Sequence, residues 1–276
     1  MALIELSGPD AVAFAQAQFC NDVPSLADGH WQWNAWLSPQ GRVRFFFHLL
    51  RDDAHHLRLL TRGGDPIELR DALKRFVLRS KVDIRIVDDA HAYGFDNAAE
   101  ISDEPAMGNS IATSGDGSTI AVSANRWISI KTQATSGATD DQSKWLLADI
   151  RDGIPIVSCE IEDAALPQWL GLDRLGTVSV RKGCYPGQEI MSRLHFKGGN
   201  KRGLFHLSIE TAKIPAAGSP IALRGETGHV GQIVMAAVAD NSHCEALAIL
   251  SHSAEDKSIA LDAEPGAKID VVRRFE

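Results

Sequence analysis

A short glycine-flanked motif in the second half of the chain constrains this protein more than any other feature. It spans residues 182–189 and has the sequence KGCYPGQE. Glycines on both sides of a Cys-Tyr-Pro turn favour a tight loop in which the backbone can come close to a ligand. The apolar spacing that follows Gln188 predicts a short helix. We therefore expect a ligand-facing turn that leads into the N-terminus of a helix.

The residues around this motif are unusually basic. Residues 181–202 contain six Lys/Arg and one acid, a local charge of +5, in a chain whose net charge is −8. The rest of the chain therefore carries −13 (−8 minus +5). This asymmetry favours an anionic ligand or partner, although a solvated basic loop also accounts for the charge. The acidic balance of the whole chain argues against a protein that coats DNA.

Cys184 is the candidate catalytic residue. It lies just upstream of the expected helix N-terminus and next to Arg181 and Lys182, and both features favour a reactive thiolate. A small, buried apolar role is the alternative for any single cysteine. Tyr185 is expected to be a packing or hydrogen-bonding ring.

The four cysteines are too far apart for a zinc site or a disulfide framework, so we expect no metal ligands. They are Cys20, Cys159, Cys184 and Cys244. The N-terminus does not resemble a signal peptide, and the longest apolar runs are too short to span a membrane. These features predict a cytoplasmic protein without a membrane partner.

Hydrophobic patterning predicts an α+β fold for the first part of the chain. A helix is expected to begin at Ser7, as its cap, and to end near Cys20. Three strands at 30–37, 42–50 and 55–61 should form a meander, with Trp31 and Trp33 on one face and Trp36 on the other. A second helix should begin at 65–66 and bury Leu69, Leu73, Phe76 and Val77, before a strand at 82–86.

The remaining sequence predicts connecting segments and then a region rich in strands. Loops or weakly structured connections are expected at 96–117 and 133–141, strands at 119–123 and 126–131, a helix at 140–152 and a helical turn at 162–170. Beyond residue 203, five short strands are spaced as in a small β-barrel or sandwich, and we take the barrel as the prediction. We therefore predict an α+β region of two intertwined subdomains over 1–199 and a barrel over 200–276.

The 182–189 motif resembles the signature of the YgfZ family of folate-binding proteins. This family is related to the glycine-cleavage T-protein and to the mitochondrial folate-dependent iron–sulfur assembly factor. The resemblance covers most of the chain except 96–140 and parts of the last domain. It continues at Leu6 to Phe14, Pro39-x-Gly41-Arg42, Leu73 to Phe76, Ser80 to Val82, Gly153 to Pro155, Leu166 to Gln168 and Phe196 to Arg202.

The resemblance implies a T-protein-like ring of antiparallel α+β domains with a C-terminal barrel, around a site for tetrahydrofolate or a one-carbon derivative. It also implies a role in making or repairing iron–sulfur proteins, including a tRNA methylthiolation enzyme. Folate and iron–sulfur client or assembly proteins are the implied partners. The candidate cofactor-binding residues are Lys182, Gly183, Tyr185, Gly187, Gln188, Glu189, Arg193, Lys201 and Arg202.

Two departures from the T-protein pattern bear on the chemistry. Phe45 and Phe46 stand where the T-protein has a carboxylate pair, one Asp of which serves aminomethyl transfer. A phenyl ring neither accepts a proton nor stabilises a cationic intermediate by charge. Arg151 falls near the position of the T-protein's pterin-binding Glu, with Asp152 adjacent, and a guanidinium has no acceptor for the pterin N–H groups.

These observations leave three hypotheses. The first is a folate-binding accessory factor for iron–sulfur protein assembly or repair, which supports tRNA methylthiolation indirectly and is not a self-sufficient enzyme. The second is a folate-dependent aminomethyl or one-carbon transferase, against which Phe45 argues. The third is a module that contacts tRNA directly through the basic segment, for instance through Lys197, Lys201 and Arg202.

Overall fold

A computed structural model describes residues 1–97, 108–115, 117–133 and 142–276, apart from the side chains of His195 and Lys197. The chain forms two compact units that interleave along the sequence. The first unit comprises residues 1–36, 45–139 and 176–186, and the second comprises 37–44, 140–175 and 187–276. The boundary predicted at 199/200 falls inside the second unit, and most of the loop predicted at 133–141 lies outside the described residues.

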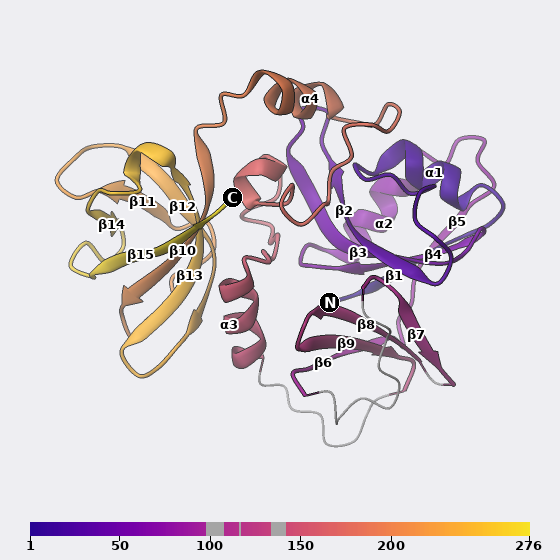
Figure 1. The fold of residues 1–276 in the computed structure, drawn as a ribbon, viewed down its shortest axis with the longest axis horizontal. Coiled ribbons are helices and arrows are strands. Elements are labelled where there is room, and N and C mark those ends of the chain that lie inside the picture. Colours follow the sequence, from indigo (N-terminus) through magenta and orange to yellow (C-terminus); the bar gives the residue numbers. More distant parts are fainter. Residues whose placement is uncertain (98–107, 116, 134–141) are drawn as a thin grey trace. The chain divides into compact units, whose positions relative to one another are not determined.

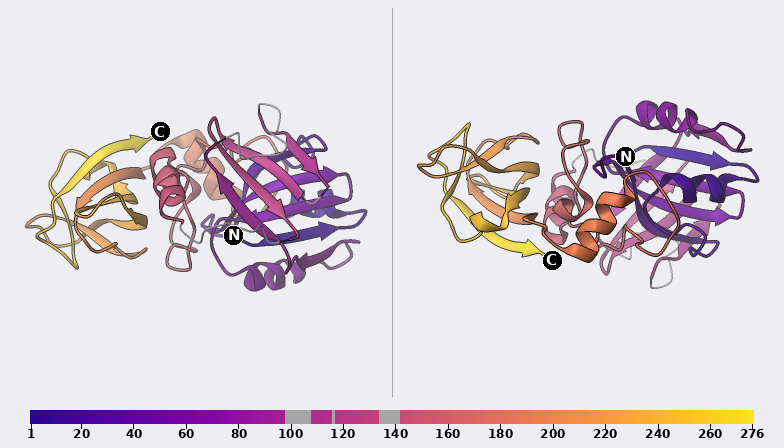
Figure 2. Two further views of the ribbon diagram at one scale, coloured as in Figure 1. Left: turned by 90° about the horizontal axis from the view of Figure 1, so that it is seen from below. Right: turned by 90° about the horizontal axis from the view of Figure 1, so that it is seen from above.

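A five-stranded antiparallel sheet with the order β2-β3-β4-β1-β5 is the centre of the first unit (Figure 1). Helices α1 and α2 cover one of its faces (Figures 1 and 2). The elements are β1 (Leu3–Ser7), α1 (Ala11–Gln18), β2 (His30–Leu37), β3 (Val43–Asp53), β4 (His56–Thr61), α2 (Pro66–Lys74) and β5 (Asp83–Ile86).

Strand β3 shows how the sequence pattern directs side chains to the two faces of this sheet. Phe45 and Phe47 belong to the core under the helices, whereas Phe46 and His48 point to the opposite face. The same alternation in β2 places Trp36 against Phe45, with ring centroids 6.2 Å apart. The predicted separation of Trp31 and Trp33 from Trp36 is therefore confirmed.

A second, four-stranded sheet with the order β6-β9-β8-β7 covers the other face (Figures 1 and 2). Its strands are β6 (His91–Phe95), β7 (Ile111–Ser114), β8 (Gly117–Ser123) and β9 (Arg126–Lys131). Arg58 on β4 donates a hydrogen bond to the Ser118 hydroxyl on β8 across 3.0 Å, which links the two sheets.

Three local predictions in the first unit were wrong. Ser7 ends strand β1 instead of capping a helix, and α1 begins at Ala11, because residues 3–7 pair with both β4 and β5. Residues 111–114, which the sequence places in a loop, form β7 on the edge of the second sheet. Phe76 is 46% exposed instead of buried, because α2 ends at Lys74.

The helical segments of the second unit agree with the sequence pattern. They are α3 (Ser143–Asp152), the 3₁₀ helix η2 (Pro167–Leu170) and α4 (Gln188–Lys197). Gly153 follows α3 with φ of 68°, in the left-handed conformation that ends many helices. The helix expected after Gln188 is therefore confirmed as α4.

The C-terminal strands form one six-stranded sheet with the order β14-β11-β12-β13-β10-β15. It curves around its own apolar core as an open half-barrel, with β14 and β15 at the edges (Figure 1). The small β-barrel predicted for 200–276 is therefore not confirmed. The strands are β10 (Arg202–Glu210), β11 (Pro220–Leu223), β12 (His229–Val238), β13 (His243–Ser251), β14 (Ile259–Leu261) and β15 (Ile269–Phe275), and a 3₁₀ turn η3 (His252–Ala254) follows β13.

Candidate functional site

The 182–189 motif is divided between the two units. Residues up to Pro186 belong to the first unit, and residues from Gly187 onward belong to the second. In the first unit, the segment that leads into the motif is anchored beside α1. The Asn21 side-chain amide donates to the Trp33 and Gly176 carbonyls over 2.9 and 2.8 Å, and the Ser179 amide donates to the Cys20 carbonyl over 2.9 Å.

Lys182 is the most extensively hydrogen-bonded residue of this segment. Its ammonium donates to the backbone carbonyls of Gln16 and Asn21 over 2.7 and 3.0 Å, and also to that of Phe19. The Gln16 carbonyl is among those that the end of α1 leaves without a helical partner. Burial lowers the pKa of Lys182 to about 8, whereas the three carbonyl acceptors favour its charged form. Lys182 therefore holds the end of α1, and cofactor binding by this residue stays a prediction.

Tyr185 and Cys184 have contrasting environments. The Tyr185 ring is 8% exposed and lies 4.9 Å from the Lys182 ammonium, and burial raises the pKa of its hydroxyl. This packing agrees with the role expected for the ring. The neighbouring Cys184 is exposed and forms no disulfide. Its thiol is therefore open to solvent and to a reaction partner.

The other three cysteines are less suitable as nucleophiles. Burial raises the pKa of the Cys20 thiol to about 12, and burial also raises the pKa of Cys244. Cys159 is exposed, but its hydrogen bond with the Glu160 carboxylate raises the pKa of its thiol. Within the described ranges, no group of His, Cys, Asp and Glu is arranged to hold a metal ion.

In the second unit, the motif begins with a close contact between two glycines. Gly187 caps α4 with φ of 81°, and a Cβ at this position would lie 2.5 Å from the Ser38 carbonyl oxygen and 2.7 Å from the Gly41 Cα. Gly41 itself has φ of 75°, and its Cβ would lie 3.0 Å from the Ile190 Cβ. Residues 38–42 at the tip of the β2–β3 hairpin therefore pack directly on the N-terminus of α4.

Two arginines converge on one indole ring in the same unit. The guanidinium carbon of Arg202, at the start of β10, lies 5.1 Å from the centre of the Trp169 ring, and that of Arg42, at the hairpin tip, lies 6.0 Å from it. Arg42 also donates to the Ala164 carbonyl over 2.6 Å. Across the described ranges, neither guanidinium has a carboxylate partner. The cluster of Arg42, Trp169 and Arg202 can therefore accept an anion.

Sequence reasoning identified Arg202 but missed Arg42 and Trp169 as site residues. Arg42 lies in a segment that resembles the family and Trp169 in an expected helical turn, yet only folding brings the three side chains together. Of the other predicted residues, Gly183, Glu189, Arg193 and Lys201 are exposed, and Gln188 is half-buried at the first turn of α4. Their roles in cofactor binding stay predictions.

Arg151, which the sequence resemblance predicts near the position of the T-protein's pterin-binding Glu, forms an ion pair. Its guanidinium donates to both carboxylate oxygens of Glu245, at 2.5 and 3.1 Å, and His206 contacts the same carboxylate at 2.7 Å. The Arg151 hydrogen bond lowers the pKa of Glu245, and burial lowers the pKa of His206. Arg151 therefore links α3 to β13.

Phe45 and Phe46 are 1% and 0% exposed and belong to the core of the first unit. Phe45 stacks on Trp36, and Phe46 stacks on Trp33 with ring centroids 4.9 Å apart. Both rings are therefore part of the packed core, and their correspondence to the T-protein carboxylates stays a prediction.

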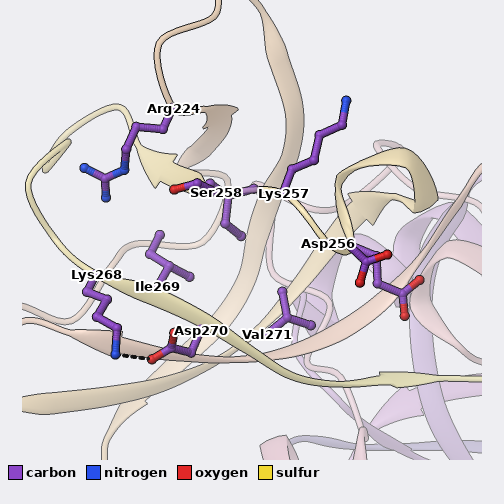
Figure 3. A pocket seen from close by; sticks show the side chains of 10 residues that line it. Arg224, Asp256, Lys257, Ser258, Lys268, Ile269, Asp270 and Val271 are labelled. Carbon is purple, nitrogen blue, oxygen red and sulfur yellow. Dashed lines mark ion pairs between the residues drawn. The ribbon is translucent and has the colours of Figure 1, made fainter.

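A pocket of about 420 Å³ lies elsewhere in the second unit, at the open edge of the curved sheet (Figure 3). Residues 255–259 and 268–271 form its walls, and Arg224 lines it from the end of β11. The Lys268 ammonium pairs with Asp270 at 2.9 Å, and Arg224 donates to the Pro265 and Ala267 carbonyls. This pocket contains none of the predicted site residues.

Comparison with solved structures identifies the class of fold. The chain matches the glycine cleavage system aminomethyltransferase T from Bartonella henselae with a TM-score of 0.68, over 100% of this chain and 85% of that chain. Because the two sequences are only 13% identical, the match establishes a T-protein fold and nothing about activity.

Sequence comparison finds relatives with one shared name, although no protein-family model matches the chain. The chain is 28% identical to the tRNA-modifying protein YgfZ of Klebsiella pneumoniae, over 94% of this chain and 85% of that protein. It is also 28% identical to the YgfZ of Aliivibrio fischeri strain ES114, over 98% of this chain and 89% of that protein. The resemblance to YgfZ proteins that the 182–189 motif predicts is therefore confirmed. Throughout the described segments, no helix is both long enough and apolar enough to cross a membrane.

Proposed function

We propose that this protein is a folate-binding accessory factor that supports tRNA modification through the assembly or repair of iron–sulfur proteins. The observation that carries the proposal is a T-protein fold in which Phe45 and Phe46 fill the core, in a chain whose sequence is similar to proteins named tRNA-modifying. Without the acid or base that those positions supply in the T-protein, binding is a better-supported role than aminomethyl transfer.

The cluster of Arg42, Trp169 and Arg202 fits the acidic end of a folate. Folate ends in a glutamate, and guanidinium groups are the side chains that best match carboxylate geometry. Stacking on Trp169 orients both guanidiniums, while neither has a carboxylate partner among the described residues. Tetrahydrofolate or a one-carbon derivative would thus be held by its glutamate in the second unit, and the bound folate would supply one-carbon chemistry.

Other predicted residues complete the proposal. Glu189, Arg193 and Lys201 are exposed and available to a ligand, whereas Arg151 is held by Glu245. We assign the exposed Cys184 a thiolate role toward a cluster, a persulfide or a partner protein.

Titration with tetrahydrofolate, followed by tryptophan emission, tests the binding step. We expect saturable quenching, which Arg42→Ala and Arg202→Ala weaken and which Lys213→Ala, at an exposed lysine of the same unit, leaves unchanged. Wild-type protein that shows no saturable response removes folate from the proposal.

Complementation tests the accessory role. In cells that lack the protein, we expect Cys184→Ser to leave iron–sulfur enzyme activity low, while Cys159→Ser, at the other exposed cysteine, restores it. Full restoration by Cys184→Ser would rule out the thiolate role.

Direct contact with tRNA is a second candidate that the basic segment favours. Phosphate contacts are strongly dependent on charge, so reversal at Lys201 and Arg202 should weaken the binding of a tRNA transcript. A flat response to these reversals would argue against it.

A further inference from the structure

We propose that residues 74–81, which run from the last residue of α2 toward β5 in the first unit (Figure 1), are a docking surface for an acidic protein face with an apolar pocket that receives Leu78. This inference deepens the proposed accessory function, because a protein that serves clients needs a surface that recognises them. The segment contains four cations and no acid: Lys74, Arg75, Arg79 and Lys81.

The first observation is the exposure of large apolar side chains in this segment. Leu78 is 87% exposed, and the neighbouring Phe76 is 46% exposed. Single exposed apolar residues are common on protein surfaces, but here two of them lie together among cations. Val77 between them packs on the core of the unit, and the Phe76 ring lies 6.0 Å from the Trp36 ring in a T-shaped arrangement. Leu78 is therefore the side chain that projects furthest into solvent.

The second observation is that the backbone holds Leu78 in place. The Phe76 and Leu78 amides donate to the Leu73 and Phe76 carbonyls, each over 2.9 Å. At the other end of the segment, the Lys81 amide donates to the Asp10 carboxylate over 2.7 Å. A fixed segment loses little conformational freedom when a partner binds, which favours association.

The third observation is unbalanced charge. Within the described part of the chain, none of the four cations of the segment forms an ion pair. Lys74 and Arg75 are near enough to Asp71 to lower the pKa of its carboxyl, but the hydrogen bond from Arg70 is the larger cause of that shift. An incoming partner therefore needs carboxylates to match this surface.

The apolar side chains decide between classes of anionic partner. Phosphates of RNA would pair with the cations but would leave Leu78 in water. A protein face supplies both carboxylates and an apolar pocket, and interface anchors of this kind are surrounded by polar groups that exclude water.

Site-specific photo-crosslinking tests the inference in full-length protein produced in cells of the source organism. The photoreactive residue p-benzoylphenylalanine replaces Leu78 in one variant. In a matched control it replaces Ile67, which is 53% exposed on α2 outside the segment. Crosslinked peptides are identified by mass spectrometry, with and without Arg75→Glu and Arg79→Glu in the same chain.

We expect discrete protein adducts at position 78 but not at position 67, through peptides that combine carboxylates with apolar residues. The double charge reversal should lower their yield at least tenfold. Equal adducts at both positions, adducts sensitive to ribonuclease, or adducts that survive the reversal would each overturn the inference. Tetrahydrofolate titration of the same double variant should match wild type, so failure of the docking surface is distinct from failure of folate binding.

Discussion

The two units that share the 182–189 motif contain cationic side chains in opposite situations. In the first unit, the Lys182 ammonium has three backbone carbonyls as acceptors. In the second unit, Arg42 and Arg202 stack on Trp169, and neither has a carboxylate partner in the part of the chain that the structure describes. A cation in a signature motif is therefore not necessarily a ligand-binding cation. It can bind a ligand only if its N–H donors are not already hydrogen-bonded to acceptors within the protein.

The two glycines of the motif differ in the same way. A Cβ at Gly183 would meet nothing within 4 Å, whereas a Cβ at Gly187 would collide with the backbone of the hairpin tip. Position 183 can therefore accommodate many residue types, whereas the close contact at position 187 requires glycine.

Gly187→Ala should give the largest effect. The left-handed conformation and the 2.5 Å approach to the Ser38 oxygen should together cost about 3 kcal/mol of unfolding free energy. Gly183→Ala should change it by less than about 0.5 kcal/mol. Urea denaturation of both variants measures the difference, and equal midpoints would remove the distinction between the two glycines.

Lys182→Met should have the second largest effect on stability. The variant keeps most of the side-chain volume but leaves three carbonyls without their donor, which should cost about 2 kcal/mol. Lys201→Met, at an exposed lysine, should cost less than about 0.5 kcal/mol. If Lys182→Met retains wild-type stability and instead loses tetrahydrofolate binding, the structural assignment of Lys182 is wrong.

Arg42→Ala should weaken tetrahydrofolate binding about tenfold, which corresponds to about 1.4 kcal/mol. Arg202→Ala should have a similar effect, since both guanidiniums contact the same indole. Fluorescence titration checks both variants. Unchanged affinity in both would show that the anion-accepting cluster is not the folate site.

The smallest expected effect is a pH dependence that involves the Arg151–Glu245–His206 network. Both the Glu245 and His206 pKa values are lowered in the folded protein, so the unfolded state binds more protons on acidification. The free energy of unfolding should therefore fall as the pH drops below the pKa of a His in the unfolded chain, about 6.5. It should fall again below the pKa of a Glu in the unfolded chain, about 4.3. Glu245→Gln should reduce the loss of unfolding free energy below pH 5 by about 1 kcal/mol, as measured by urea denaturation at several pH values. If the slope below pH 5 is the same in the variant as in the wild type, this prediction is wrong.

Much of the fold could be predicted because its elements have strong local signals. The alternation in β2 and β3 and the Asp65-Pro66 start of α2 correctly located these elements. Strand β1 was missed because its identity depends on pairing with β4 and β5, which are distant in the sequence. Strand β7 was missed because a strand of four residues has little pattern of its own.

The sequence by itself determined the resemblance to YgfZ proteins, the turn at 182–189 that leads into a helix, and the presence of phenyl rings, which are neither acids nor bases, at positions 45 and 46. Each of these depends on the identity of residues within a short stretch, which is fixed before the chain folds. Only the tertiary structure decided that Lys182 holds the end of α1, that Arg151 pairs with Glu245, and that Arg42 joins Arg202 at Trp169. These roles depend on which donors and acceptors meet across more than 90 positions of sequence, and hydrogen bonds and ion pairs act only over a few ångströms.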